Sequence, residues 1–403
     1  MPSRSMAFVL ALVFTLSPLA IDMYLPAFTA IATDLSVSTQ DIAITISIYI
    51  LGFSLGQFLG GPLSDYHGRR RVMLLGLAVF CASSLVLGVA SEIRLFWLFR
   101  FVQAMGGGIA AVVVPAVIRD HTEGQEAARL FTLIGLITII APAIAPALGT
   151  ALFMLSGWRA IFFALAGFTA LVFLVAGHHL RKLVAPAPLP TSEKLWQRYR
   201  YVLSNTVAMR YLLAQGLVLG VMMTFLANSS LVYMEKYGVN ESVFSVLFAA
   251  NIVTMAVFNR LNSVLLKSIP AGRIVVPAIA LQSTAAVTLL LVTGFAPPLW
   301  LVVPLVMLSV GVMSCVMGNG QACALDFFPN HSGVAAALMG SGQFLIAAMV
   351  SAISTQFHSD LMWPMSATMA GASLLALLIV PSYRTWRTRR EEMERATEQP
   401  LPA

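Results

Sequence analysis

The feature that most constrains this chain is a series of apolar stretches, each about 20 residues long and bounded by charged or turn-forming residues. A helix of that length crosses the hydrocarbon core of a bilayer, so each stretch predicts a transmembrane helix. The predicted spans fall near residues 6–33, 42–63, 71–90, 95–118, 128–152, 159–177, 209–234, 242–263, 272–293, 298–324, 332–355 and 362–383. These twelve helices form two sets of six and leave little chain for a soluble domain.

Composition agrees with the membrane class. Hydrophobic residues make up 59% of the 403 residues and charged residues 10%, with a mean hydropathy of +0.86, whereas soluble domains carry roughly 25% charged residues. The connection 178–208 has a Pro-rich centre and basic flanks, which neither continue a helix nor enter lipid. We therefore predict an all-α membrane protein with an N-terminal six-helix half (1–177), a cytoplasmic linker (178–208), a C-terminal six-helix half (209–383) and a cytoplasmic tail (384–403).

Basic residues indicate the orientation. If the first helix enters from the cytoplasm, the alternating loops place all but four of the 24 Lys and Arg residues on the cytoplasmic side, the exceptions being Arg94, Arg100, Arg159 and Lys236. This bias follows the positive-inside rule and keeps both termini in the cytoplasm. Attraction to anionic headgroups accounts for the formal charge of +7. We expect the lipid bilayer as a partner, and no nucleic acid.

Only two ionisable side chains lie deep inside predicted spans. Of the 17 acids, only Asp22 is well inside a span, and Arg100 is the corresponding base. A charge at the bilayer centre costs about 3 kcal/mol on insertion scales, so such residues indicate an ion or proton site or a substrate counter-ion. The alternative is a buried ion pair between Asp22 and Arg100 that holds two helices together.

Asp22 has the chemistry of a proton site. Desolvation disfavours the charged carboxylate, whereas Arg100 or a cationic substrate favours it. A proton and a cation would then compete for one carboxylate, and each would leave as the other arrives. This competition is the physical basis of antiport.

The sequence GPLSDYHGRRRVM between the second and third spans carries a recognisable motif. It resembles the G-x-L-a-D-r-x-G-r-k pattern of the major facilitator superfamily, with Tyr66 where that family usually has Arg. The glycines permit close helix approach and a tight turn, and the arginines anchor the loop at the cytoplasmic side. The predicted gating residues of this motif are Gly61, Asp65, Gly68, Arg69 and Arg70.

The same resemblance implies a latch between the two halves. In the family, the motif Asp meets the inner end of span 11, which here is Asn330, His331 and Ser332, a sequence with capping character. Asp65 at such a helix N-terminus would be stabilised by the helix dipole. The alternative is an ordinary loop turn.

Two further spans carry partial motifs. In span 4, Arg100 and Gln103 lie one helical turn apart and resemble the superfamily motif R-x-x-q-G-x-g, which is linked to proton relay, with Ala104 in place of a glycine. In span 5, Pro146 and Gly149 resemble the antiporter motif, and Pro142 shares a face with Pro146. We expect a gating hinge there; the alternative is a kinked packing helix.

Taken together, LAIDMYLPAF, the GPLSD turn, RFVQAMG, VIRDHTEGQEAAR, IAPAIAPALG and GWRAIFFAL resemble the bicyclomycin and chloramphenicol resistance subfamily of twelve-span drug–proton antiporters. In that subfamily the first-span Asp, here Asp22, is a proton and cation site. The resemblance implies proton-coupled efflux of small lipophilic or cationic compounds from the bacterial inner membrane by alternating access. Each chain would contain a complete pathway and work as a monomer.

Polar and aromatic side chains within the spans are candidates for a substrate cavity. An amide in lipid needs a partner or must face a cavity, although ordinary interhelical hydrogen bonds explain any single amide equally well. The predicted cavity residues are Tyr24, Tyr49, Phe53, Gln57, Gln103, Phe225, Asn228, Asn251, Asn319 and Gln343.

The sequence contains no motif for a nucleotide or a metal ion. The glycines at 106–108 follow no strand and precede no Lys, so they form no phosphate-binding loop, and the three cysteines match no metal pattern. We expect no ATP, metal or other cofactor, and energy from a proton gradient. Export of a metabolite such as a sugar, amino acid or siderophore stays open. A non-transporting receptor or an enzyme using Asp22 is a remote alternative, because the spans hold no constellation of a second buried acid, His or Ser that would support catalysis.

Overall fold

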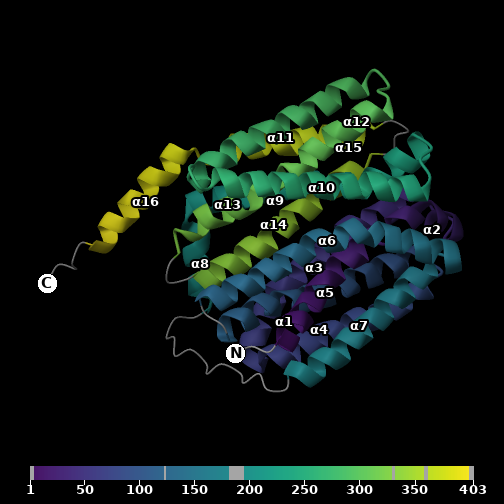
Figure 1. Cartoon of the computed structure of the whole chain (residues 1–403), viewed down its shortest axis with the longest axis horizontal. Helices are drawn as coiled ribbons and strands as arrows, with labels where there is room; N and C mark the ends of the chain where they lie inside the picture. Colours follow the sequence, from purple (N-terminus) through teal and green to yellow (C-terminus); the bar gives the residue numbers. More distant parts are fainter. Residues whose placement is uncertain (1–3, 122–123, 181–194, 329–331, 358–361, 399–403) are drawn as a thin grey trace. The chain divides into compact units, whose positions relative to one another are not determined.

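The computed structural model describes residues 4–121, 124–180, 195–328, 332–357 and 362–398 (Figure 1). Within these ranges it does not describe the side chains of 4–7, 119, 121, 124–139, 195, 332–333 and 393–398. All regular elements in the described ranges are helical. They are α1 (Arg4–Asp22), η1 (Leu25–Ala27), α2 (Phe28–Asp34), α3 (Thr39–His67), α4 (Arg69–Gly88), α5 (Ile93–His121), α6 (Gly124–Ser156), α7 (Arg159–His179), α8 (Leu195–Ser204), α9 (Thr206–Ser230), the π-helix η3 (Leu231–Lys236), α10 (Glu241–Leu265), α11 (Ala271–Thr293), α12 (Leu299–Gly311), α13 (Met313–Leu325), α14 (Ser332–Thr355), α15 (Trp363–Ile379) and α16 (Tyr383–Glu398).

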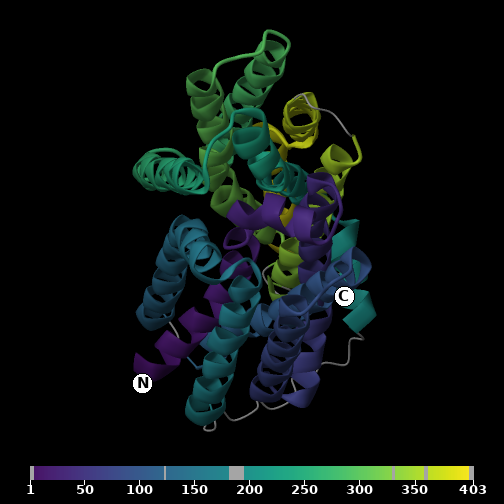
Figure 2. The ribbon, with the colours of Figure 1, turned by 90° about the vertical axis from the view of Figure 1, so that its right-hand side faces the viewer.

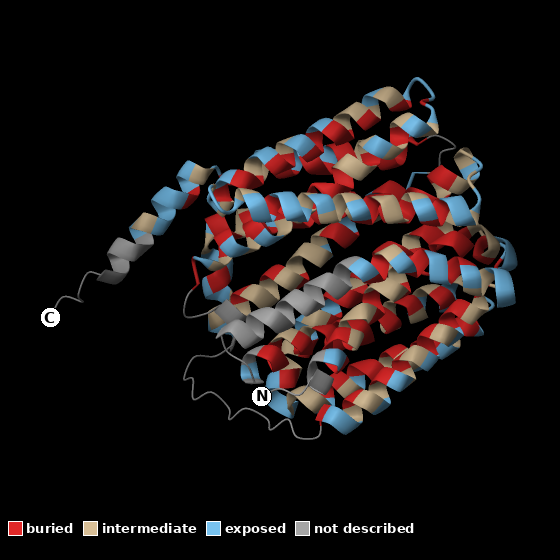
Figure 3. Ribbon diagram, in the orientation of Figure 1, coloured by how far each residue is buried: buried red, intermediate tan, exposed pale blue. Residues whose placement is uncertain are grey.

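The predicted all-α membrane class is confirmed. Within the described ranges, 10 helical segments are long and apolar enough to cross a bilayer, and up to 11 if α15 is counted with the start of α16, which is bent from it by 41°. The other predicted span corresponds to α6, whose described apolar part is Ile140–Ser156. Large apolar side chains point outward, among them Leu155, Leu174 and Leu378, and exposed residues recur along α7 and α11 (Figure 3). Such surfaces suit lipid as the solvent.

Local signals explain where individual helices begin and end. Ser38 caps α3 with a capping box: its hydroxyl accepts from the Asp41 N–H, while the Asp41 carboxylate accepts from the Ser38 N–H at 3.0 Å. At the other end of α3, Gly68 has φ of 90°. That conformation favours glycine and turns the chain directly into α4.

Helices α3, α4, α5 and α7 lie side by side, and α1 contacts α5, α6 and α7 (Figures 1 and 2). The close packing of α3 on α5 depends on glycine. A Cβ added to Gly56 would overlap the Met105 carbonyl, and one added to Gly108 would overlap the Phe53 carbonyl. Small residues of this kind let membrane helices pack backbone to backbone.

The chain forms two compact units. Unit 1 comprises 1–190, 226–252 and 351–361, and unit 2 comprises 191–225, 253–350 and 362–403. Unit 1 thus includes parts of α9, α10 and α14, which come from the second half of the sequence. Hydrogen bonds hold these parts to the N-terminal helices: Ser47 donates to Ser351 and Thr150 bonds Ser245, each at 3.0 Å. The predicted halves are ranges of the sequence, whereas the two units are defined by contacts in space. The units therefore do not test the predicted boundaries, which stay a prediction.

In unit 2, α16 begins against the ends of two spans. The buried Trp386 indole donates to the Cys323 carbonyl of α13 at 3.0 Å. The Arg273 guanidinium of α11 lies 4.9 Å from the centre of the Tyr383 ring. Beyond this anchor α16 is largely exposed (Figure 3).

Candidate functional site

The first span is interrupted directly after its buried acid. Helix α1 ends at Asp22, Met23 and Tyr24 form a turn, and η1 leads into α2 at Phe28. Pro26 causes the interruption, because it has no N–H to donate to the Asp22 carbonyl and its ring clashes with that carbonyl in a continuous helix. We call residues 22–27 the break. Asp22 therefore lies at a helix C-terminus inside a predicted transmembrane span.

The environment of Asp22 disfavours a bare negative charge. The residue is 3% exposed, and its Oδ1 atom has no hydrogen-bond partner in the described part of the chain. It also lies at the C-terminus of α1, the negative end of the helix dipole. A buried carboxylate with an unpaired oxygen is costly unless it takes up a proton or a cation.

Arg100 lies against the same break but is held by other groups. Its Nη1 atom donates to the Ala20 carbonyl at 3.2 Å and to Gln103 Oε1 at 2.7 Å. Its guanidinium carbon is 4.3 Å from the centre of the Tyr24 ring and 4.5 Å from that of Tyr49. Arg100 thus caps the end of α1 and lies between two aromatic faces, both favourable for a desolvated guanidinium.

A polar chain extends this cluster. Gln103 Nε2 donates to Ser84 Oγ on α4 at 2.7 Å, and the Tyr24 hydroxyl bonds Thr45 on α3 at 2.7 Å. Three residues predicted separately as cavity walls, Tyr24, Tyr49 and Gln103, are therefore assembled around Arg100. Their predicted contact with substrate stays a prediction.

Asp22 and Arg100 do not form the direct ion pair that was the alternative interpretation. Among the ion pairs of the described residues, none joins these two side chains within 4 Å. The Nη1 atom of the guanidinium donates to a backbone carbonyl and an amide, and its face lies between two rings, while its Nε and Nη2 atoms have no hydrogen-bond partner in the described part of the chain. This arrangement leaves Asp22 available to a proton or a cation.

The span 5 motif packs against the break. Pro142 and Pro146 lie inside α6, which is helical from Gly124 to Ser156. A Cβ added to Gly149 would overlap the Met23 carbonyl oxygen and lie 2.6 Å from its carbon. Only glycine allows α6 to approach the residue next to Asp22 this closely. The motif contact is thus a steric one, and the hinge role of the prolines stays a prediction.

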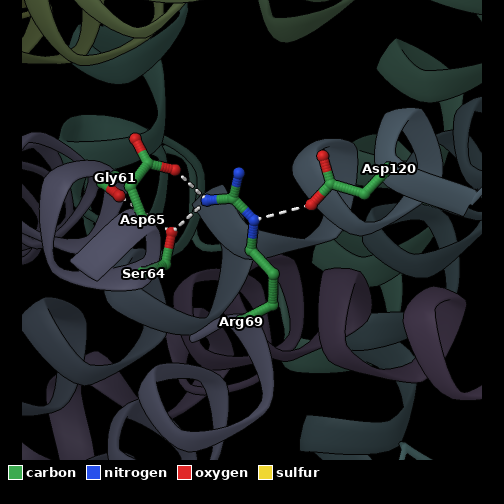
Figure 4. A network of polar contacts seen from close by, with 5 residues as sticks. All are labelled: Gly61, Ser64, Asp65, Arg69 and Asp120. Atoms are coloured by element: carbon green, nitrogen blue, oxygen red, sulfur yellow. Dashed lines mark hydrogen bonds and ion pairs between the residues drawn. The ribbon is translucent and has the colours of Figure 1, made fainter. Parts of the chain in front are cut away.

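The motif between α3 and α4 forms a network around Arg69 (Figure 4). The Arg69 guanidinium donates to Asp65, to Ser64 Oγ at 2.7 Å and to Asp120 Oδ2 at 2.8 Å. Ser64 Oγ donates to the Gly61 carbonyl at 2.8 Å. The side chain of Tyr66, at the atypical position, is 86% exposed, so the network forms without it.

Two further findings concern this motif. Arg70, at the start of α4, donates to the Gly177 carbonyl at the end of α7 at 2.9 Å. This bond joins α7 to the same end of unit 1 as the Arg69 network. Asp120 was not predicted as a partner; its position in VIRDH at the end of span 4 was the available signal. The predicted latch partners Asn330 and His331, and the Ser332 side chain, lie outside the described residues, so the latch stays a prediction.

The remaining cavity candidates divide by their partners. Asn228 donates to Ser354 at 2.9 Å, and Asn319 donates to Asn262 at 2.7 Å, as the interhelical alternative predicts. Asn251 bonds the Leu247 carbonyl within its own helix at 3.0 Å. The others are Phe53 and Phe225, which are buried, and Gln57 and Gln343, which are half-buried. Their contact with substrate stays a prediction.

Metal binding has no described site. In the described part of the chain, no group of three or more His, Cys, Asp or Glu side chains is placed to hold an ion. The cysteines Cys81, Cys315 and Cys323 are free thiols.

A polytopic helical protein with a buried acid at a broken span has the construction of a secondary transporter. Comparison with known proteins identifies the family. The sequence profile described as Major Facilitator Superfamily matches residues 10–352. The chain therefore belongs to the major facilitator superfamily, and it is a membrane transporter of small molecules rather than an enzyme.

Relatives and structures agree with this assignment. A protein from Haemophilus influenzae named bicyclomycin resistance protein homolog is 29% identical and covers 92% of this chain and 93% of its own length. The multidrug resistance protein MdtL of Salmonella schwarzengrund is 27% identical over 94% of this chain and 95% of its own. The crystal structure of a D-xylose-proton symporter aligns with a TM-score of 0.78 at 15% identity, covering 95% of this chain and 99% of its own, which shows the shared fold. The predicted resemblance is confirmed.

Proposed function

We propose that this protein is a drug–proton antiporter of the bacterial inner membrane, which exports small lipophilic or cationic compounds by alternating access. The observation that carries the proposal is Asp22: a buried carboxyl at an interrupted helix, next to an arginine that does not neutralise it. The names of the relatives, bicyclomycin resistance and multidrug resistance, support drugs as the cargo.

The exchange follows from competition at Asp22. When the carboxyl is protonated, the site is neutral and tolerates burial. Substrate entering from the cytoplasm, above all a cation, stabilises the carboxylate and favours release of the proton. The protonated carrier returns to the cytoplasmic side after substrate has left outside. Each ligand thus lowers the affinity for the other by the same factor.

Arg100 maintains the site in this scheme. The Arg100 guanidinium lies against the Tyr24 and Tyr49 rings and donates to the Ala20 carbonyl. It therefore fixes the end of α1 without forming an ion pair with the Asp22 carboxylate. It also raises the local positive potential, which favours proton release when substrate arrives. The proposal requires no nucleotide and no bound cofactor.

The proposed orientation places both termini in the cytoplasm, as the distribution of Lys and Arg favours. A single chain holds the complete Asp22 site within unit 1, which supports function as a monomer.

The test is transport by the purified protein in liposomes. With an imposed proton gradient, we expect accumulation of a lipophilic cationic dye that stops when a protonophore is added. The control is the Asp22→Asn variant in matched liposomes, which should accumulate no more dye than empty ones. Dye movement that ignores the gradient would refute proton coupling, and transport of sugars or amino acids instead of dyes would refute the cargo.

A further inference from the structure

The break beside Asp22 is held from three directions. Arg100 on α5 donates to the Ala20 carbonyl just before it. Gly149 on α6 lies against the Met23 carbonyl. The third group is Ser230 on α9, whose hydroxyl donates to the Leu25 carbonyl at 2.6 Å. The break is thus fixed by the neighbours of its backbone as well as by Pro26.

Ser230 is unusual among these groups because it comes from the second half of the sequence, 205 residues away. It is the last residue of α9, directly before the π-helix η3, and it is fully buried. Short π-helical segments often occur at functional positions. The same segment contacts α3, since Thr39 bonds Glu235 in η3. All these residues belong to unit 1.

The neighbouring serine shows that this bond is specific. Ser229 is equally buried, but its hydroxyl donates to the Leu226 carbonyl of its own helix at 2.9 Å. Serines in helices commonly bond backwards in this way. Ser230 instead donates to a carbonyl in another element, three residues beyond Asp22.

We propose that Ser230 is a positioning residue for Asp22: its bond to the Leu25 carbonyl couples the packing of the end of α9, residues 226–230, on the other helices of unit 1 to the closure of the Asp22 site. This inference rests on the proposed function for its biological meaning. When the Ser230 bond is made, the break is fixed and Asp22 is sealed; when the bond opens, the break loses a constraint and water gains access to the carboxyl. By linkage, the tethered state holds the proton more tightly.

Few groups besides Asp22 titrate in this region. The ionisable side chains described around Arg100 and the break are Tyr24 in the turn, Tyr49 on α3 and Arg100 itself on α5. The η3 segment after Ser230 adds Tyr233, Glu235 and Lys236. Helix α7, which contacts α1, carries Arg159, paired with Asp34, and His178 and His179 in its last turn. The described part of α6, Ile140–Ser156, contains no ionisable residue, and the tether from α9 is a neutral hydroxyl. A change in protonation near the break therefore reports chiefly on Asp22.

The test is labelling of Asp22 by dicyclohexylcarbodiimide, which reacts with protonated carboxyls in apolar surroundings. The purified full-length protein is labelled across a pH series, and modification of the Asp22 peptide is measured by mass spectrometry with Asp22→Asn as the blank. We expect Ser230→Ala to lower the pH of half-maximal labelling by about half a unit, the size of effect that one lost hydrogen bond gives. Ser229→Ala, the matched control, should label like the parent, and Ser230→Thr, which keeps a hydroxyl, should restore the profile.

A second variant tests the same break from another side. In Gly149→Ala the added Cβ must displace the Met23 carbonyl, so we expect a shift in the same direction. Gly220→Ala, whose Cβ would meet the Val350 side chain at 2.8 Å in unit 2, is the control for a similar steric change elsewhere. If Ser230→Ala does not fold, the comparison of Gly149→Ala with Gly220→Ala tests whether the position of the break sets the protonation of Asp22.

Coinciding profiles for the parent and Ser230→Ala would overturn the proposal, whatever Gly149→Ala shows. So would an equal shift in Ser229→Ala and Ser230→Ala, because the bond to Leu25 would then be irrelevant. Labelling reads protonation without transport. A protein whose export proved independent of the proton gradient would refute the proposed function and leave the labelling result intact.

Discussion

Two interrupted spans in the described part of the chain, one in each unit, differ in chemistry. In the first, α1 stops at Asp22 and the freed backbone is capped by a charged side chain, Arg100, through the Ala20 carbonyl. In unit 2, α12 and α13 meet at Val312, and a neutral amide, Gln282 of α11, donates to the Ser309 carbonyl at 2.9 Å. Both caps are fully buried. A break in a membrane helix therefore needs a donor for its carbonyls, but the donor need not be charged.

The difference between the two caps indicates the role of the positive charge on Arg100. Gln282 satisfies a carbonyl beside a break whose own residues, Val310 to Met313, are apolar or glycine, so that break serves packing or bending. Arg100 does the same for a break that carries a buried acid, and it adds positive potential there. A neutral cap would satisfy the backbone equally well. The charged one is explained by the proton chemistry proposed for Asp22.

The largest effect should come from Asp22→Asn. The amide keeps the shape of the side chain but has no exchangeable charge, so coupled export should fall to the level of liposomes without protein. Transport assays measure this, and thermal unfolding in detergent should show a folded variant. Normal export of every substrate by this variant would make Asp22 a structural residue.

Next, removal of the charged cap should destabilise the protein. Arg100→Gln leaves the Ala20 carbonyl and the Gln103 amide without their donor and loses contact with both rings, at a cost on the order of 3 kcal/mol. Thermal unfolding should show a marked drop in the midpoint, together with impaired coupling. If stability were unchanged, the capping role would be wrong.

The neutral cap should give a smaller and different effect. Gln282→Leu leaves the Ser309 carbonyl without its donor and should cost about 1 to 2 kcal/mol. The number of protons exchanged per substrate should stay as in the parent. Altered coupling in this variant, measured by proton flux and substrate flux together, would show that the two breaks are not functionally distinct.

The smallest stability effects should come from the Arg69 network. The Asp65 side chain is 65% exposed and the Asp120 side chain 20% exposed, and exposed ion pairs contribute little. Asp120→Asn should lower the unfolding midpoint slightly, and Asp65→Asn should leave it unchanged. A large loss of transport in stable Asp65→Asn would point to the predicted latch rather than to local stability.

How far the sequence predicted this molecule depends on the range of the interaction. Spans could be assigned because apolar length is a local property, and Asp22 and Arg100 stood out because charges in apolar stretches are rare. Pro26 lies four residues after Asp22, and a proline inside a span weakens its helix. Its full interruption, and the capping of Ala20 by Arg100, require helices distant in sequence to come together.

The partners of the site were beyond prediction for the same reason. Ser230 lies beside Ser229 near the end of a predicted span, and no local sequence pattern connects it with Leu25. Gly149 was found through a motif, but its contact with Met23 follows only from the packing of α6 on α1. Similarly, the division into units does not follow the sequence halves, because parts of α9, α10 and α14 pack with the N-terminal helices.

Proton release on substrate binding reports on the exchange of proton and substrate proposed at Asp22. Purified protein in weakly buffered detergent solution is mixed with a lipophilic cationic drug while the pH is recorded. We predict release of protons by the parent protein and none by Asp22→Asn that still binds drug. Equal release from both proteins would contradict the proposed exchange.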